Sequence, residues 1–199
     1  METSDMVVVD SSDISPAKAF GLLKASVVPR PIAWTSTISP VGVNNLAPFS
    51  FFTVVSSAPP MVLLSLEPHE DGRRKDTAEN IDATGEFVVN IASAQLAAEV
   101  EATSTPFASE VDEFALAGLT PAPCRHVRAP RIAEASISLE CHLHSSLTPG
   151  SDQLIIGEVV AFHIASGVLG ADGRIDVQRV NPLARTAAHF ARIVPLIHP

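Results

Sequence analysis

Residues 29–42 read Pro29-Arg-Pro-Ile-Ala-Trp-Thr-Ser-Thr-Ile-Ser-Pro-Val-Gly42, and this stretch decides the fold class. Pro29 and Pro31 exclude an α-helix around Arg30, because proline lacks the backbone N–H and its ring clashes with the preceding turn. Residues 32–38 are rich in β-branched side chains, and the last four residues are a turn signal. The stretch therefore predicts a β-strand followed by a hairpin.

Short apolar runs separated by turn residues continue this pattern along the chain. Residues 44–50 read as irregular, whereas we predict further strands at 51–55, 61–66, 86–92, 137–144 and 154–164. In the fourth of these runs apolar and polar residues alternate, which is typical of a strand with one buried face. Asp172-Gly173 marks a tight turn.

Helical patterns are fewer and shorter. Ser15-Pro16 opens one, and a second begins at Asp76 or Thr77, either of which can cap it, and ends at Gly85. Two more helical pieces are expected at 95–102 and 110–117, separated by a turn at Pro106. Most connections between strands are too short for right-handed crossovers, so a mainly β barrel with accessory helices is favoured over a βαβ sandwich.

Length and composition indicate one domain. The chain has 199 residues, enough for one sizeable core, and we treat residues 1–199 as a single domain with an N-terminal tail at 1–13. A hydrophobic fraction of 46% and a mean hydropathy of +0.27 are high for a monomer. Apolar surface buried between subunits is therefore expected, which predicts a homo-oligomer.

The charge distribution argues against nucleic acid as a partner. The formal net charge is −9, and the longest run of cations is Arg73-Arg-Lys75. Such a run in an acidic chain either receives one small anion or is a solvated turn, and both readings stay open.

Neither a membrane nor an oxidising compartment is indicated. No apolar run approaches the roughly 20 residues that a membrane helix needs, and Glu2 and Asp5 stand where a signal peptide would be basic. Cys124 and Cys141 have no metal-type spacing and form no disulfide framework. We expect a cytoplasmic protein.

Several signatures of other enzyme classes are missing. The sequence contains no G-x-G-x-x-G, P-loop, G-x-S-x-G or H-E-x-x-H pattern, and Ser15-Pro-Ala-Lys18 lacks the companion motifs of an S-x-x-K enzyme. Glu140, His142 and His144 share one face of a predicted strand and offer metal-binding side chains. A solvent-facing or subunit-facing side of an amphipathic strand explains them better, so no metal is predicted.

Three groups of residues between Arg30 and Ile91 together suit a phosphorylated aromatic ligand. Thr35-Ser-Thr37 place hydroxyls at a strand end, and 45–52 combine an amide, small residues and phenylalanines. Arg73-Arg-Lys75 stand just before a helix N-terminus. Cations and helix N–H groups bind phosphate, while apolar walls and close backbone approach accommodate a heteroaromatic ring.

Five ordered motifs make this region specific. They are Arg30-Pro-Ile-Ala-Trp-Thr-Ser-Thr37, Asn45-Leu-Ala-Pro-Phe-Ser-Phe-Phe52, Ser57-Ala-Pro-Pro60, Arg74-Lys-Asp-Thr-Ala-Glu-Asn-Ile81 and Thr84-Gly-Glu-Phe-Val-Val-Asn-Ile91. The series resembles the flavin reductase-like family, which includes the reductase components of two-component flavin monooxygenases. The similarity continues through Pro130-Arg-Ile-Ala-Glu134, Leu139-Glu-Cys141 and Gly157-Glu-Val-Val160, so that it covers roughly residues 15–192.

The resemblance implies a split β-barrel that binds FMN, with FAD or free flavin as alternatives, and a homodimer with the flavin near the subunit interface. It implies that Thr35, Ser36 and Thr37 line the flavin and its ribityl chain. Asn45, Leu46, Ala47 and Ser50 would meet the isoalloxazine ring, and Arg74, Lys75 and Thr77 would hold the phosphate. Pro48, Phe51 and Asp76 complete the implied cofactor-binding set.

The implied activity is transfer of hydride from NADH or NADPH to flavin, with a partner monooxygenase as one destination for the electrons. The cofactor does the chemistry, so no catalytic side chain is assigned, and Asn45 is a hypothetical donor to the ring. An FMN-bearing electron carrier and a redox-inactive flavin-binding module are the alternatives. The family often has two glycines and a tyrosine after Pro-Leu-x-Arg, whereas here Ala187-Ala-His-Phe190 follow; His189 is either substrate-facing or a surface residue.

Overall fold

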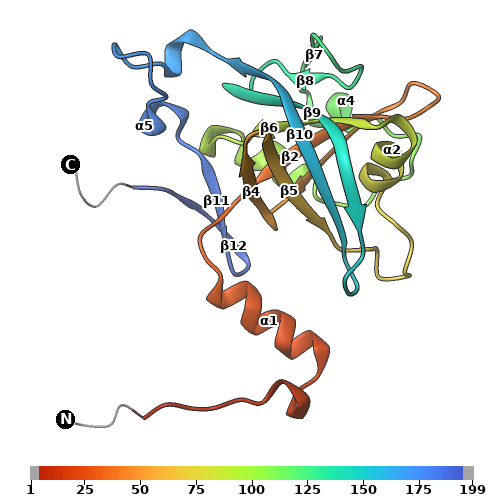
Figure 1. Cartoon of the computed structure of the whole chain (residues 1–199), viewed down its shortest axis with the longest axis vertical. Helices are drawn as coiled ribbons and strands as arrows, with labels where there is room; N and C mark the ends of the chain where they lie inside the picture. The colour runs from red at the N-terminus through yellow and green to blue at the C-terminus, as the bar shows by residue number, and fades with distance from the viewer. Residues whose placement is uncertain (1–4, 195–199) are drawn as a thin grey trace.

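The computed structural model describes residues 5–194 and shows a mainly β architecture, as the sequence predicts (Figure 1). Seven strands form one antiparallel sheet in the order β3-β2-β6-β9-β10-β5-β4. These strands are β2 (Ala33–Ile38), β3 (Asn44–Phe49), β4 (Phe52–Ser57), β5 (Pro60–Leu66), β6 (Glu86–Ile91), β9 (Ile137–Leu147) and β10 (Gln153–Ile164).

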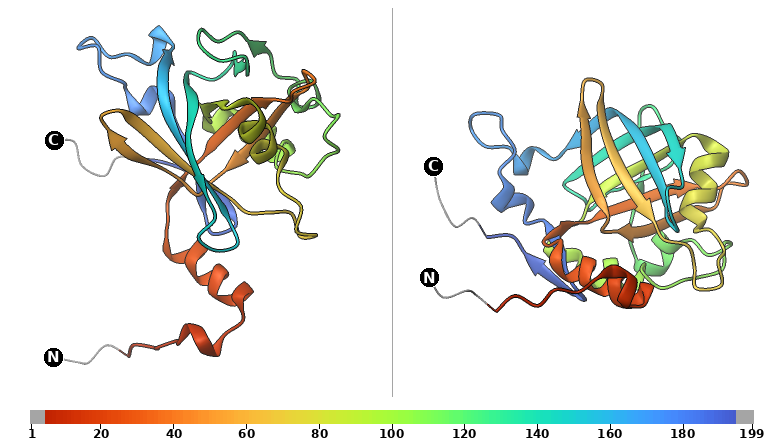
Figure 2. Two further views of the ribbon diagram at one scale, coloured as in Figure 1. Left: turned by 45° about the vertical axis from the view of Figure 1, so that its right-hand side comes forward. Right: turned by 60° about the horizontal axis from the view of Figure 1, so that its bottom comes forward.

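The two edge strands of this sheet are consecutive in the chain. Only Ser50 and Phe51 separate β3 from β4, so the sheet has to curl round until its edges meet (Figure 2, right). The edges are not joined by a β-ladder, and this leaves a barrel with a seam. The Ser65 N–H of β5 donates to the Phe51 carbonyl at 2.8 Å and so holds the linker between β3 and β4 against β5.

The two largest of three apolar clusters in the described chain hold the barrel together. One fills its interior and contains Leu64, Phe87 and Ile155, none of which is exposed to solvent. The other, around Trp34 and Phe114, lies under η2 (Ala94–Leu96), α3 (Ala97–Ala102) and α4 (Glu113–Ala117). These helices confirm the predicted piece at 95–102. The predicted helix at 110–117 starts only at residue 113, because the Asp112 side chain accepts the N–H groups of Phe114 and Ala115.

Helix α2 (Asp76–Thr84) packs against β2 and β3. Its end is confirmed, since Gly85 has a left-handed φ of 73°. Its predicted cap is wrong: Lys75 occupies the N-cap position, and no side chain caps the helix there. The first N–H groups of α2 therefore lack a capping acceptor from the N-cap side chain.

The N-terminal part extends away from the barrel (Figure 1). The 3-10 helix η1 (Ser11–Asp13) precedes α1 (Pro16–Ser26), whose N-cap Ser15 accepts the Lys18 N–H as predicted. Helix α1 contains no buried residue, and Met6, Val7 and Val8 are each more than 80% exposed. This segment, residues 5–26, therefore leaves several apolar side chains exposed to solvent.

Smaller elements complete the described chain. They are β1 (Arg30–Pro31), β7 (Pro121–Ala122), β8 (Arg131–Ile132), η3 (Ser166–Val168), α5 (Val177–Val180), β11 (Leu183–Thr186) and β12 (His189–Arg192). The hairpin β11–β12 pairs with β1 and was not predicted. Two other expectations are wrong: 44–49 form the strand β3, and 137–141 are buried on both faces of β9.

We predict that Ala187→Gly stabilises the fold. Ala187 lies in the two-residue turn between β11 and β12 with φ = 35°, a region in which a Cβ is unfavourable. Glycine should raise the free energy of unfolding by about 1 kcal/mol. Urea denaturation measures this; Ala188→Gly, at the neighbouring turn residue outside the left-handed region, is the control and should give no gain.

Candidate functional site

A cavity opens where the edge strand β3 meets the N-terminus of α2. Its walls come from β3, from the start of α2, from the loop after α3 and from α4. The lining residues are Asn45, Ala47, Pro48, Phe49, His69, Lys75, Asp76, Thr77, Thr103, Ser104, Thr105, Pro106, Phe107 and Glu113. Six of these, namely Asn45, Ala47, Pro48, Lys75, Asp76 and Thr77, belong to the set implied by the motifs.

The positive end of this cavity is formed by Lys75 and the first turn of α2. The Lys75 ammonium lies 3.2 Å from His69 Nδ1, and it forms no ion pair with any residue of the described range 5–194. The helix dipole adds positive potential at the same end, since the first N–H groups point out of the helix. The Asp76 carboxylate accepts from the Ser109 hydroxyl at 2.6 Å. An anion is the ligand that this end favours.

A buried network of hydroxyls and amides holds Asn45 in the cavity wall. Asn45 Nδ2 donates to Thr37 Oγ1 at 3.0 Å and to Thr77 Oγ1 at 2.9 Å. Asn80 Nδ2 also donates to Thr37 Oγ1, at 3.0 Å. Thr37 therefore supports the site from behind and joins β2, β3 and α2. Both amide hydrogens of Asn45 are used in this arrangement, which leaves its carbonyl oxygen to accept from a ligand.

The other end of the site lies along the seam of the barrel, where phenylalanines stand beside the charged side chains of Lys24 and Glu67. Phe49, Ser50 and Phe51 line a second hollow with Phe20 of α1, and Pro48 and Lys75 line both hollows. The rings of Phe20 and Phe51 meet edge to face at 5.8 Å. A flat heteroaromatic group therefore has apolar surface beside it and a cation at one end.

Two titratable residues of the cavity, Glu113 and His69, were not singled out from the sequence. Glu113 Oε2 accepts the Leu46 N–H at 3.0 Å and so fixes β3 to α4. Burial raises the pKa of Glu113, the Leu46 N–H opposes this, and the nearby carboxylates of Asp76 and Asp112 raise it further. The acidic first turn of a predicted helix was the available signal for Glu113; His69 gave none.

Seven residues of the implied set do not line this cavity. Ser50 and Phe51 line the second hollow, and Thr37 lies behind the cavity wall, whereas Thr35, Ser36, Leu46 and Arg74 line neither hollow. The Thr35 hydroxyl donates back to the Ala33 carbonyl, and Ser36, on the opposite face of β2, donates to the Pro130 carbonyl at 2.5 Å. The Leu46 side chain lies in the second apolar cluster.

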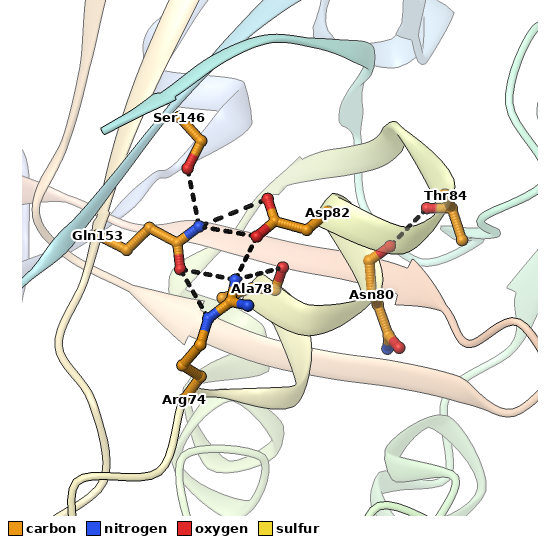
Figure 3. A network of polar contacts seen from close by, with 7 residues as sticks. All are labelled: Arg74, Ala78, Asn80, Asp82, Thr84, Ser146 and Gln153. Carbon is orange, nitrogen blue, oxygen red and sulfur yellow. Dashed lines mark hydrogen bonds and ion pairs between the residues drawn. The ribbon is translucent and has the colours of Figure 1, made fainter. Parts of the chain in front are cut away.

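Arg74 lines neither hollow. Its guanidinium contacts the Asp82 carboxylate, the Gln153 side-chain oxygen at 2.9 Å and the Ala78 carbonyl at 3.3 Å (Figure 3). Gln153 in turn donates to Asp82 and to Ser146. Arg74 thus ties α2 to β10, whereas Lys75 lines the cavity.

The polar cluster on β9 differs from the predicted arrangement. His142 and His144 are exposed, but Glu140 is completely buried and accepts the N–H groups of residues 125–127 together with His163 Nε2. Expecting Glu140 on a solvent-facing or subunit-facing side was therefore wrong.

Cys124 joins this cluster: its sulfur and the nearest atoms of Glu140 and His163 lie within 4.8 Å of one another. Burial, together with the Glu140 charge, raises the pKa of Cys124 to about 11, so the thiol is protonated at neutral pH. The Glu140 carboxylate is already saturated with donors and anchors the loop at 125–127.

The altered C-terminal motif forms the tip of the hairpin β11–β12. His189 is exposed, whereas Phe190 packs against the second apolar cluster and carries the Arg185 guanidinium 4.6 Å above its ring.

In the described part of the chain, no helix is long and apolar enough to span a membrane.

Comparisons with known proteins agree with this fold. An uncharacterized protein of Aquifex aeolicus (strain VF5) is 38% identical over 171 residues, which cover 86% of this chain and 87% of that protein. One of Bacillus subtilis (strain 168) is 36% identical over 196 residues, or 94% and 95% of the two chains. The crystal structure of nitrilotriacetate monooxygenase component B from Bacillus cereus superposes with a TM-score of 0.92 at 31% identity and covers 98% of each chain. The model of the flavin reductase like domain matches residues 25–192, so the chain belongs to the flavin reductase-like family of flavin-related oxidoreductases.

Proposed function

We propose that this protein binds FMN in the cavity between β3 and α2 and reduces it with NADH or NADPH. The observation that carries the proposal is the ammonium of Lys75, which forms no ion pair with a described residue and stands at the uncapped N-terminus of α2. A phosphate ester matches this end of the cavity in charge and in hydrogen bonding. Family membership independently supports a flavin as the ligand.

The remaining residues of the site fit the rest of such a ligand. Asn45, held by Thr37 and Thr77, offers an acceptor to a hydroxyl or ring N–H. Ala47 and Pro48 allow close approach of the β3 backbone, and Phe49 and Phe51 supply apolar surface. When bound, the flavin supplies the ability to accept hydride from a nicotinamide. The protein binds, orients and shields it from water, and no acid–base side chain is required.

Apolar surface on residues 5–26 supports a homodimer. This segment exposes more apolar surface than an isolated chain favours, on Met6, Val7, Val8, Leu22 and Leu23. We propose that a second copy covers part of this segment and brings the flavin sites near the interface. By analogy with the name of the Bacillus cereus protein, a monooxygenase component is the proposed recipient of the electrons.

Two optical measurements test the proposed reaction. The purified protein should bind FMN with quenching of its fluorescence, and the bound flavin should bleach when NADH or NADPH is added without oxygen. Bleaching by dithionite alone would instead select an electron carrier. Bound flavin that neither nucleotides nor dithionite reduce would select the redox-inactive module, and failure to bind flavin would reject the site.

Asn45→Ala tests the polar wall of the cavity. Loss of the amide removes one acceptor for the ligand and the donor to the Thr77 hydroxyl, whereas Thr37 keeps the bond from Asn80. We expect FMN affinity to fall about tenfold, the effect of one or two lost hydrogen bonds. Fluorescence titration measures it, with Gln178→Ala, which removes an exposed amide outside the cavity lining, as the control. Unchanged affinity and reduction rate in Asn45→Ala would exclude a role for Asn45.

A further inference from the structure

A separate cavity lies at the end of β3 and the following Ser50, against the hairpin β11–β12. It is lined by Pro48, Phe49, Ser50, Ser104, Arg185 and Phe190, with Ile32 at its base, and its volume is about 160 Å³. Pro48, Phe49 and Ser104 also line the proposed flavin cavity. The two cavities therefore share a wall, and a small molecule in this one would lie next to the proposed flavin ring.

One guanidinium group, that of Arg185, lines this cavity, and that of Arg30 lies behind it with a bond to the lining residue Ser50. Arg30 and Arg185 are directly paired between β1 and β11. Arg30 is buried and donates to neutral acceptors, namely Ser50 Oγ at 3.3 Å and the carbonyls of Lys24, Val27 and Ala187. Burial and the charge of Arg185 both lower the pKa of Arg30, as expected for two cations with too little counter-charge.

The Arg185 guanidinium has free donors. It makes no hydrogen bond to any residue in 5–194, and its nearest carboxylate, Glu101, lies 3.7 Å away with a side chain that is 63% exposed. Such a pair contributes little. The group instead makes a cation–π contact with Phe190, with its Cζ atom 4.6 Å from the ring centroid. Its N–H donors are therefore available to an anionic ligand.

We propose that this cavity binds a planar aromatic carboxylate, whose charge is held by Arg185 and whose ring lies between Pro48 and Phe190. A volume near 160 Å³ suits a single six-membered ring. The inference rests on the proposed function, because the bound molecule is then an organic substrate of the flavin. Arg185 is the residue that makes anionic substrates preferred over neutral ones of the same shape.

Benzoate and its neutral isostere benzamide are the probes. Calorimetric titration of the full-length protein, with and without FMN, should show tighter binding of benzoate. Arg185→Gln should weaken benzoate binding about tenfold or more and leave benzamide unchanged. Arg192→Gln removes the same charge from the exposed end of the hairpin and should change neither. Glu101→Gln removes the competing carboxylate and should tighten benzoate binding, a gain that a purely structural role of Arg185 does not predict.

Equal binding of the two probes, or equal losses in Arg185→Gln, would overturn the inference. A tenfold rise of the KM for NADPH in Arg185→Gln with unchanged benzoate affinity would also overturn the inference. Arg185 would then bind a phosphate of the nucleotide and not a carboxylate. FMN binding, titrated separately in each variant, keeps the two proposals apart. If wild-type protein does not bind FMN, the proposed function fails, whereas the benzoate titration still decides on the anion site.

Discussion

Replacing Lys75 by glutamine is expected to weaken FMN binding by between about tenfold and a hundredfold, the effect of one charged hydrogen bond in a partly buried site. The ammonium lines the cavity and has no counter-ion among the described residues, so its charge is available to a phosphate. Riboflavin, which lacks the phosphate, should bind equally well to Lys75→Gln and to the wild type. Fluorescence quenching by the protein measures both affinities.

The neighbouring residue provides a matched control. Arg74→Gln also removes one positive charge, but from a guanidinium that is bound to Asp82 and Gln153 outside the cavity. It should reduce FMN affinity by less than about threefold, through long-range and screened electrostatics alone. A loss in Arg74→Gln as large as that in Lys75→Gln would show that the phosphate lies elsewhere, as would an equal loss for riboflavin.

Glu140→Gln is expected to cause the largest loss of stability, about 3 kcal/mol or more. The carboxylate is completely buried and accepts the N–H groups of Arg125, His126 and Val127 as well as His163 Nε2. An amide keeps the shape but turns an NH2 group toward these donors, so that some are left unpaired. For a chain of this length the melting temperature should fall by roughly 6–12 °C.

A carboxylate on the adjacent strand that has an exposed ion-pair partner serves as the control. Glu86 pairs with Arg128 at 2.9 Å; the Arg128 side chain is 63% exposed and the Glu86 side chain 12%. Glu86→Gln should therefore cost less than about 1 kcal/mol. If both variants lose the same stability in urea denaturation, Glu140 does not anchor the loop at 125–127.

The same carboxylate gives the stability a definite dependence on pH. Burial by itself would raise the pKa of Glu140, but the donated N–H groups and His163 outweigh it and lower the pKa from 4.5 to about 2. The unfolded chain therefore binds this proton more readily than the folded one. The contribution of the Glu140 carboxylate to the free energy of unfolding is complete above pH 4.5 and is lost as the pH falls toward 2. Wild-type stability should fall in this window, and that of Glu140→Gln should fall less.

Local signals predicted those elements that depend on their own residues. Pro29 and Pro31 exclude a helix, Ser15 caps α1, and Gly85 adopts the left-handed conformation that ends α2. Strand β3 was missed because Pro48 and two asparagines make 44–49 look irregular. In the structure β3 is an edge strand, where proline is tolerated because its missing N–H faces no partner strand.

By itself the sequence determined the mainly β class, the family and the segments that form the candidate site, because strand patterns and ordered motifs are properties of short stretches. Only the tertiary structure decided which side chains of those segments face the cavity. Arg74 and Lys75 are adjacent and equally charged, yet only Lys75 lines the cavity. The chain enters α2 at this point, so that the Arg74 side chain contacts Gln153 of β10, whereas Lys75 lies on the side of β3. Glu140 is buried for a similar reason: the donors at 125–127 that make its burial favourable come from a distant loop.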